Sequence, residues 1–269
     1  MNEMQNQVAG VLARLREKRP LVLSLTNTVV QNFTANLLLA VGAVPVMLAH
    51  AEEIDDLLHS CADGLLVNLG TVQENQARLM RSAVVSAREA GIPWVLDPVA
   101  VGLLRFRTEL CHDLLGTPPA MIRGNASEIM AAAGVQAAAC RGPESGAASS
   151  DAVAAARQLA SDTGSVVLVT GEIDYMTDGI TTYGCSNSDV LLTRVTGTGC
   201  AMGALAAACL AVADSPLQAA AATAAILGVA GERAAAAARR PGSLVPAMLD
   251  ELDALTPDDV AETTRIFLV

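Results

Sequence analysis

Lysine is almost absent from this sequence, because Lys18 is the only lysine among 269 residues. Without a further lysine, neither a Walker-type phosphate loop nor a Schiff-base site can form outside the N-terminal segment. Any phosphate must then be bound by arginine, by backbone N–H groups or through a metal ion. This scarcity narrows the nucleotide chemistries that the chain can use.

Basic charge as a whole is also scarce. The chain has 17 Lys and Arg against 28 Asp and Glu, which gives a formal net charge of -11. Sequence-independent binding of nucleic acid, or of an anionic membrane, needs a basic face. We therefore expect small-molecule partners, with neither nucleic acid nor a membrane surface among them.

Long apolar segments and paired cysteines are missing too. The longest apolar run, from Cys200 to Ala213, is too short to span a bilayer and predicts a buried helix. No signal peptide precedes the first predicted helix, so we expect a cytoplasmic location. The six cysteines form no CxxC pair, and a hydrophobic fraction of 52% is enough for a core. Reduced thiols are therefore expected, without a structural zinc site.

Short apolar runs alternate with segments of helical length along most of the chain. This alternation predicts an α/β fold in which a mostly parallel central sheet carries helices on both faces. We expect one domain over residues 1–269, with antiparallel strands added between Glu172 and Val195, helices after Gly199, and a surface loop from Gly142 to Ser150. The expected strands cover residues 21–25, 44–47, 65–68, 94–97, 121–123 and 166–170.

Polar residues follow most of these strands. Each is by itself an ordinary turn residue. A parallel sheet, however, binds its ligands beyond the carboxyl ends of its strands, so the recurrence predicts a ligand cleft there. The residues concerned are Thr26 and Asn27, Asn68 and Gly70, Asp97 and Pro98, Arg123 to Asn125, and Thr170 and Gly171.

A glycine-rich turn, Gly197-Thr198-Gly199, precedes Cys200 and the long apolar run. The unpaired N–H groups at such a helix start, together with the helix dipole, form a candidate anion hole. Glycines at this place can also serve only to pack a helix closely against a strand. Both interpretations remain open from the sequence.

Several motifs together are more specific than any one of them. Their order and spacing over residues 20 to 215 resemble the hydroxyethylthiazole kinases. The motifs are Thr26-Asn27, Asn32 to Asn36, Gly42 to Met47, His50 to Glu53, Asn68 to Thr71, Asp97 to Val99, Arg123 to Glu128, Val169 to Asp174 and Val195 to Cys200.

The resemblance implies a ribokinase-like fold and transfer of the ATP γ-phosphoryl group to the hydroxyl of 4-methyl-5-(2-hydroxyethyl)thiazole, with Mg²⁺. It also implies a homotrimer whose thiazole pocket lies at the subunit boundary. Carried over by motif, the thiazole side comprises Asn27, Met47, Gly70 and Gly197, the ATP side Arg123 and Thr170, and the magnesium side Asp97 and Glu128. Cys200 stands where more distant ribokinase-like enzymes have an aspartate that accepts the proton of the substrate hydroxyl, so it is the candidate proton acceptor.

Each polar role has a structural alternative. Arg123 could form a surface salt bridge, Asp97 could cap a helix, and Glu128 could complete a capping box with Asn125. Cys200 could be a small residue packed at a helix start. If the helix terminus stabilised its thiolate, Cys200 would be a modest base.

Two segments depart from the family pattern, and different functions remain open. Val44 stands where a small polar residue is common, and Ser186 to Asp189 lacks a Gly-His pair, so the acceptor alcohol is less secure than the fold.

An NAD-dependent oxidoreductase would fit the alternation of strands and helices, but no GxGxxG follows the first strand. A non-catalytic nucleotide or thiazole binder would keep the cleft without the chemistry. A thiol hydrolase built on Cys200 would need a histidine, and no histidine lies in a matching motif.

Overall fold

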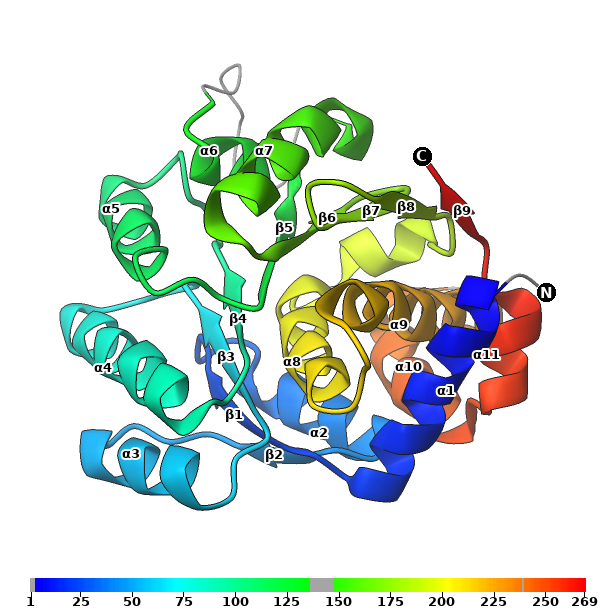
Figure 1. Cartoon of the computed structure of the whole chain (residues 1–269). Coiled ribbons are helices and arrows are strands. Elements are labelled where there is room, and N and C mark those ends of the chain that lie inside the picture. The colour runs from blue at the N-terminus through cyan, green and yellow to red at the C-terminus, as the bar shows by residue number, and fades with distance from the viewer. Residues whose placement is uncertain (1–2, 136–147, 239) are drawn as a thin grey trace.

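A computed structural model describes residues 3–135, 148–238 and 240–269 of the chain. Within this part the strands form one nine-stranded sheet in the order β2-β1-β3-β4-β5-β6-β7-β8-β9 (Figure 1). The strands are β1 Leu21–Leu25, β2 Val44–Val46, β3 Gly64–Asn68, β4 Trp94–Asp97, β5 Met121–Asn125, β6 Val166–Thr170, β7 Asp174–Thr177, β8 Thr182–Cys185 and β9 Ile266–Leu268.

The sheet is parallel from β2 through β6 and antiparallel from β6 to β9. This confirms the predicted parallel sheet and the antiparallel addition. The sequence pattern did not reveal β9, which brings the end of the chain back to the sheet beside β8. Most of the predicted loop from Gly142 to Ser150 lies outside the described residues, and its last two residues, Ser149 and Ser150, begin a short 3-10 helix.

Helices cover both faces of the sheet (Figure 1). One layer consists of α3, α4, α5, α6 and α7, and the other contains α1, α2, α8, α9, α10 and α11. The α-helices are α1 Glu3–Lys18, α2 Gln31–Val41, α3 Ala51–Ser60, α4 Glu74–Ala90, α5 Arg105–Leu114, α6 Ala126–Ala132, α7 Val153–Thr163, α8 Thr198–Leu210, α9 Pro216–Ala238, α10 Pro241–Ala254 and α11 Pro257–Thr263; the 3-10 helices are η1 Ser149–Ala152 and η2 Val190–Arg194.

The strands are apolar on both sides because each face of the sheet is covered. Successive residues along a strand point to opposite faces. Accordingly, Leu65 packs into the core under α3 and α4, whereas its neighbour Leu66 packs into the core under α8 and α9. Both side chains are fully buried.

The central helix α8 lies close to the sheet because its residues are small. A Cβ atom on Gly203 would lie 2.9 Å from Leu66 Cδ1, and one on Gly64 of β3 would lie 2.7 Å from the Ala207 carbonyl oxygen. The long α9 packs beside α8, and its alanines are buried from Ala219 to Ala235. This close packing brings the N-terminus of α8 to the carboxyl edge of the parallel strands.

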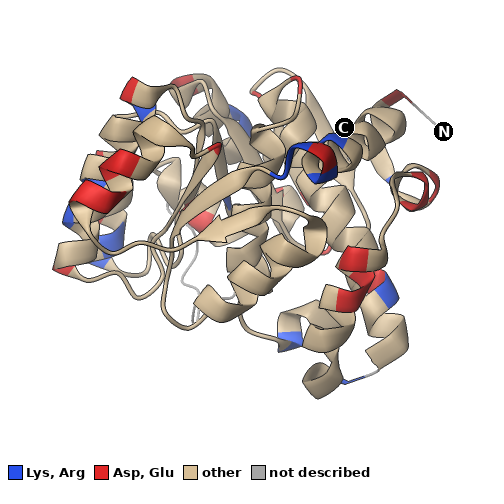
Figure 2. Cartoon of the chain, turned by 90° about the horizontal axis from the view of Figure 1, so that it is seen from below, with Lys and Arg blue, Asp and Glu red and all other residues tan. Residues whose placement is uncertain are grey.

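Charged residues lie mainly on the outer helices and on the loops. In the view of Figure 2, Lys and Arg are interspersed with Asp and Glu and form no continuous basic face among the described residues. None of the described helices combines the length and apolar character needed to cross a membrane.

Candidate active site

Two asparagines meet where the strand order of the sheet reverses. Ligands of open α/β sheets bind at such a switch point, which here lies between β1 and β3. Asn27, just after β1, donates from Nδ2 to Oδ1 of Asn68, at the end of β3, over 3.1 Å. The same Asn68 oxygen accepts the Gly70 N–H at 2.9 Å, and both asparagines are buried.

Gly70 is required next to this asparagine pair. A Cβ atom there would lie 2.7 Å from Asn27 Nδ2 and 2.8 Å from Asn68 Oδ1. The structure thus brings together two residues predicted for the thiazole side, Asn27 and Gly70. A third, Met47, directly follows the edge strand β2, which pairs with β1, and its side chain is half-buried.

Asp97 continues the polar chain from β3 to β4. Its Oδ2 accepts from Asn68 Nδ2 at 2.6 Å, and its Oδ1 lies 3.6 Å from Arg123 Nη1. Complete burial raises the pKa of Asp97 to about 7; the Arg123 charge opposes this shift, and the Glu128 charge adds to it. Asp97 does not cap a helix, since α5 begins only at Arg105, so that alternative is wrong.

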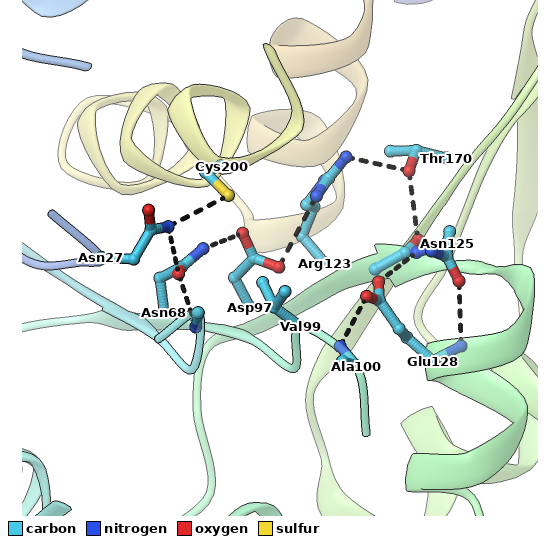
Figure 3. Close-up of polar contacts among 12 residues, drawn as sticks. Asn27, Asn68, Asp97, Val99, Ala100, Arg123, Asn125, Glu128, Thr170 and Cys200 are labelled. Atoms are coloured by element: carbon cyan, nitrogen blue, oxygen red, sulfur yellow. Dashed lines mark hydrogen bonds and ion pairs between the residues drawn. The ribbon is translucent and has the colours of Figure 1, made fainter. Parts of the chain in front are cut away.

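Arg123 lies at the centre of the site and extends from β5 toward the start of α8 (Figure 3). Its Nη2 donates to Thr170 Oγ1 at 3.0 Å, and the Thr170 hydroxyl donates to the Gly124 carbonyl at 3.3 Å. Only 9% of Arg123 is exposed. The alternative of a surface salt bridge is therefore wrong, because this guanidinium is a buried cation paired with Asp97.

The glycine-rich turn at the N-terminus of α8 lies against this guanidinium. Gly197 has a φ of 94°, a left-handed conformation that favours glycine. A Cβ atom on Gly199 would lie 2.7 Å from Arg123 Nη2. Gly199 thus leaves room for the end of the Arg123 side chain, which agrees with both interpretations of the glycines. The same geometry places the N–H groups of the first helical turn, which have no intrahelical acceptor, beside a cation.

Cys200 completes the chain on the side of β1. Asn27 Nδ2 donates to Cys200 Sγ at 3.5 Å. Burial raises the pKa of the Cys200 thiol to about 11, and Asp97 adds to the shift. The condition under which Cys200 would be a modest base, a thiolate stabilised by the helix terminus, is therefore not met, and the group is a neutral thiol at pH 7.

Glu128 forms the capping box that its spacing from Asn125 predicts. Asn125 Oδ1 accepts the Glu128 N–H, and Glu128 Oε2 accepts the Asn125 N–H, each at 3.0 Å. Its other oxygen, Oε1, accepts the Ala100 N–H at 2.9 Å. Burial raises the pKa of this carboxyl, and the two backbone N–H groups oppose that shift.

Sequence reasoning placed two further residues in the motifs of the site but assigned them no role. Asn68 links Asn27 to Asp97, and its position at the end of β3 was the available signal. Asp174 at the start of β7 accepts the Gly171 N–H at 3.0 Å, just beyond Thr170. Burial raises its pKa to about 7.

The carboxylates of the site could bind a magnesium ion that is also bound by the phosphates of the nucleotide. Within the described residues no cluster of three His, Cys, Asp or Glu side chains is placed to hold a metal ion. Magnesium, however, commonly uses only one or two carboxylates together with phosphates and water. Asp97 Oδ1 is buried, makes no hydrogen bond and lies 3.6 Å from the cation Arg123, so it is the carboxylate oxygen that could take such a ligand position.

Comparison with known families agrees with this geometry. The family model described as "Hydroxyethylthiazole kinase family" matches residues 12–258. This chain belongs to the hydroxyethylthiazole kinase family. It is 53% identical to the hydroxyethylthiazole kinase of Akkermansia muciniphila, over 98% of this chain and 97% of that protein. The corresponding enzyme of Tolumonas auensis is 51% identical, over 95% and 96%.

A solved structure supports the same assignment. The hydroxyethylthiazole kinase protein of Pyrococcus horikoshii superposes with a TM-score of 0.89 at 37% identity, covering 97% of this chain and 98% of that chain. The pyridoxal kinase of Staphylococcus aureus, at 18% identity and a TM-score of 0.59 over 79% of this chain and 87% of that chain, shows the ribokinase-like fold alone. Membership of a kinase family decides against the NAD-dependent oxidoreductase and the thiol hydrolase.

Proposed function

We propose that this member of the hydroxyethylthiazole kinase family transfers the γ-phosphoryl group of ATP to the hydroxyl of 4-methyl-5-(2-hydroxyethyl)thiazole, a step of thiamine biosynthesis or salvage. The observation that carries the proposal is the continuous polar chain from Cys200 through Asp97 and Arg123 to Thr170, beneath the N-terminus of α8. It offers a cation, a carboxylate and free N–H groups where the carboxyl ends of the strands meet.

Phosphoryl transfer asks mainly for positioning and for stabilisation of negative charge. The substrate hydroxyl oxygen bonds to the γ-phosphorus while the bond from that phosphorus to the β–γ bridging oxygen breaks, and ADP leaves with the bridging oxygen. The hydroxyl proton passes to water or to the thiolate form of Cys200. In our proposal Asn27, Met47, Gly70 and Gly197 contact the thiazole alcohol. The guanidinium of Arg123, the Thr170 hydroxyl and the N–H groups of Gly197, Thr198 and Gly199 then stabilise the phosphates.

Asp97 and Glu128 are the residues proposed to hold Mg²⁺. When bound, the ion neutralises phosphate charge and helps to orient the nucleotide. Asp97 Oδ1 has no hydrogen-bond partner, and is therefore proposed as the direct ligand. Glu128 already accepts hydrogen bonds from two backbone N–H groups. We therefore propose that it contributes to magnesium binding mainly through its negative charge and by fixing the backbone at Ala100 and Asn125.

The proposed assembly is a homotrimer of single-domain subunits that works in the cytoplasm, with the thiazole site at the subunit boundary. Met47 follows an edge strand of the sheet, and Leu39 on the adjacent helix α2 is 56% exposed. An edge strand presents unpaired backbone groups, which suits a contact with a second subunit. Light scattering of the purified protein tests the mass, and a stable monomer would contradict the trimer.

The function is tested by ADP release from MgATP in the presence of thiazole, pyrimidine or pyridine alcohols. We expect the hydroxyethylthiazole to give the highest kcat/KM. Faster turnover of another alcohol would support the kinase assignment but would contradict hydroxyethylthiazole as the substrate. Calorimetric binding of the thiazole or of ATP without ADP release would instead identify a non-catalytic binder, the one competing function that family membership leaves open.

Substitution of Cys200 tests the proton acceptor. A neutral thiol cannot accept a proton, so only the small thiolate fraction of Cys200 can act as a base. The loose transition state of phosphoryl transfer needs little proton removal early. We therefore expect Cys200→Ala to lower kcat by about 10-fold or less, since general-base catalysis at its full strength contributes more than that. Cys200→Asp, which places an ionisable oxygen at the same site, should retain or raise kcat.

Two outcomes would contradict the acceptor role of Cys200. One is an inactive Cys200→Asp variant whose circular dichroism and melting temperature match the wild type. The other is an unchanged kcat in Cys200→Ala, which would leave Cys200 as a packing residue. The buried Cys209 in the same helix offers a matched control, and Cys209→Ala should leave kcat unchanged.

The rate should depend on pH through Asp97. Its pKa near 7 in the free protein means that the carboxylate is lost as the pH falls through neutrality. We expect kcat/KM for MgATP to decrease below about pH 7, because this parameter reports the free enzyme. The corresponding decrease in kcat should lie at lower pH, since a bound cation favours the ionised carboxylate. A kcat/KM that is constant from pH 6 to 8 would contradict an essential carboxylate at Asp97.

A further inference from the structure

The turn that follows Asp97 holds a residue in an unfavourable conformation. Residues 98–104 connect β4 to α5, and Ala100 within them has a φ of 62°. Left-handed backbone is rare for a residue with a side chain, and it persists only where the surroundings impose it. Only Pro98 and Val99 separate Ala100 from Asp97, so the contacts that impose this conformation also fix where the strand ends.

Two helices hold the turn from opposite sides. From α6, Glu128 Oε1 accepts the Ala100 N–H at 2.9 Å (Figure 3). From α5, Arg107 Nη1 donates to the Val99 carbonyl oxygen at 3.3 Å, and Thr108 Oγ1 accepts the Gly102 N–H at 2.8 Å. The two groups of the Val99–Ala100 peptide, its C=O and its N–H, are thus each bound by a charged side chain.

Arg107 also acts on Glu128 through its charge. The guanidinium favours the charged form of the Glu128 carboxyl, as does Arg123, against the burial that raises the pKa of this group. In turn, Glu128 opposes the effect of partial burial, which lowers the pKa of Arg107. The contact by which Arg107 holds the turn is its hydrogen bond to the Val99 carbonyl oxygen.

We propose that Arg107 is a positioning residue of the active site, which holds the Val99–Ala100 peptide so that Asp97 is placed to bind the magnesium–nucleotide complex. The role rests on the proposed kinase function. Arg107 binds the turn and not the substrate, so its removal should weaken the use of magnesium while thiazole binding is unchanged.

The test compares Arg107→Gln with Arg105→Gln. Arg105 lies two residues away on α5, its side chain is 91% exposed, and its Nε lies 3.8 Å from Oε1 of Glu109. In Arg107→Gln we expect kcat to fall about 10- to 100-fold. We also expect the Mg²⁺ concentration for half-maximal rate to rise about 10-fold. Losses of this size are typical when residues that orient metal ligands are removed. The KM for the thiazole alcohol should stay within about twofold of the wild-type value, because the substitution does not remove a contact with the bound alcohol.

Two further measurements separate positioning from general stability. Hydrogen–deuterium exchange of peptides that cover residues 98–104 should quicken by about fivefold or more in Arg107→Gln, as a locally loosened segment opens more often. The same peptides should be unchanged in Arg105→Gln. Arg107→Lys, which retains a donor and the charge, should recover part of kcat and of the magnesium affinity.

Several results would overturn the proposal. One is an Arg107→Gln variant that matches Arg105→Gln in kcat, magnesium dependence and exchange. Another is a lowered melting temperature with normal kcat and magnesium dependence, which would make Arg107 a residue of general stability. If the wild type released no ADP with any alcohol, the proposed function would fail, whereas exchange in residues 98–104 would still decide whether Arg107 holds the turn.

Discussion

Replacing Arg123 with alanine is expected to lower kcat by about 1000-fold, the lower end of what an arginine contributes to phosphoryl transfer. The guanidinium is buried among Asp97, Thr170 and Gly199. The only lysine, Lys18, contacts Asp63 and the Ala211 carbonyl instead, so no second cation of that type can replace it. The KM for the thiazole alcohol should rise by about threefold at most, because ground-state binding of the alcohol does not depend on the phosphate cation.

Two variants make the Arg123 experiment specific. Arg123→Lys keeps the charge without the planar fork, and we expect it to recover only part of kcat. Arg105→Ala, at an exposed position, should behave as the wild type. Melting temperatures and circular dichroism of all three variants exclude misfolding. Loss of thiazole binding with unchanged use of ATP would contradict the assignment of Arg123 to the phosphates.

Much of the site could be predicted because the sheet is parallel. Five of its strands end in polar residues, and the carboxyl ends of parallel strands meet at one edge. Asn27, Asn68, Asp97, Arg123 and Thr170 come from β1, β3, β4, β5 and β6 or directly follow them, which are consecutive in the sheet. The fold alone therefore brings them into contact, without knowledge of any side-chain conformation.

Other properties depend on packing that a linear pattern does not contain. The Cys200 pKa is set by burial against the sheet, whereas the sequence shows only a helix start. Arg107 lies ten positions after Asp97 in an ordinary amphipathic helix, and nothing in its spacing reveals the contact with Val99. The β9 strand is short and its last two residues are exposed, so it lacks the apolar run that marks the inner strands.

The contacts of Asn187 are a further example of packing that the sequence pattern does not reveal. The segment Ser186 to Asp189 lacks the Gly-His pair of the family pattern. Asn187 Nδ2 donates to Glu232 Oε2 at 3.0 Å and to the Thr263 carbonyl at 3.1 Å, while its Oδ1 accepts the Arg265 N–H at 2.7 Å. This buried asparagine joins α9 to the residues before β9. The long sequence separation between its partners explains why the pattern did not reveal it.

Replacing Asp97 with asparagine is expected to raise the Mg²⁺ concentration for half-maximal rate by about 10- to 100-fold, because a neutral amide is a poorer ligand for a hard cation. Asparagine keeps the shape of the side chain and an oxygen for the 2.6 Å hydrogen bond from Asn68. The substitution therefore removes charge with little change in packing. The decrease of kcat/KM below about pH 7 should also disappear, since the group whose pKa is raised is no longer present.

The control for the Asp97 experiment is Asp113→Asn, the same chemical change at a half-exposed carboxylate that pairs with Arg81 on the outer surface. It should leave the magnesium dependence and the pH profile of the wild type intact. Because Asp97→Asn leaves Arg123 without its buried counter-charge, melting temperatures with and without MgADP are needed beside the rates. A smaller MgADP stabilisation in Asp97→Asn than in Asp113→Asn is the expected result. Equal stabilisation, together with an unchanged magnesium dependence, would assign Asp97 to charge balance with Arg123 and would require another metal ligand.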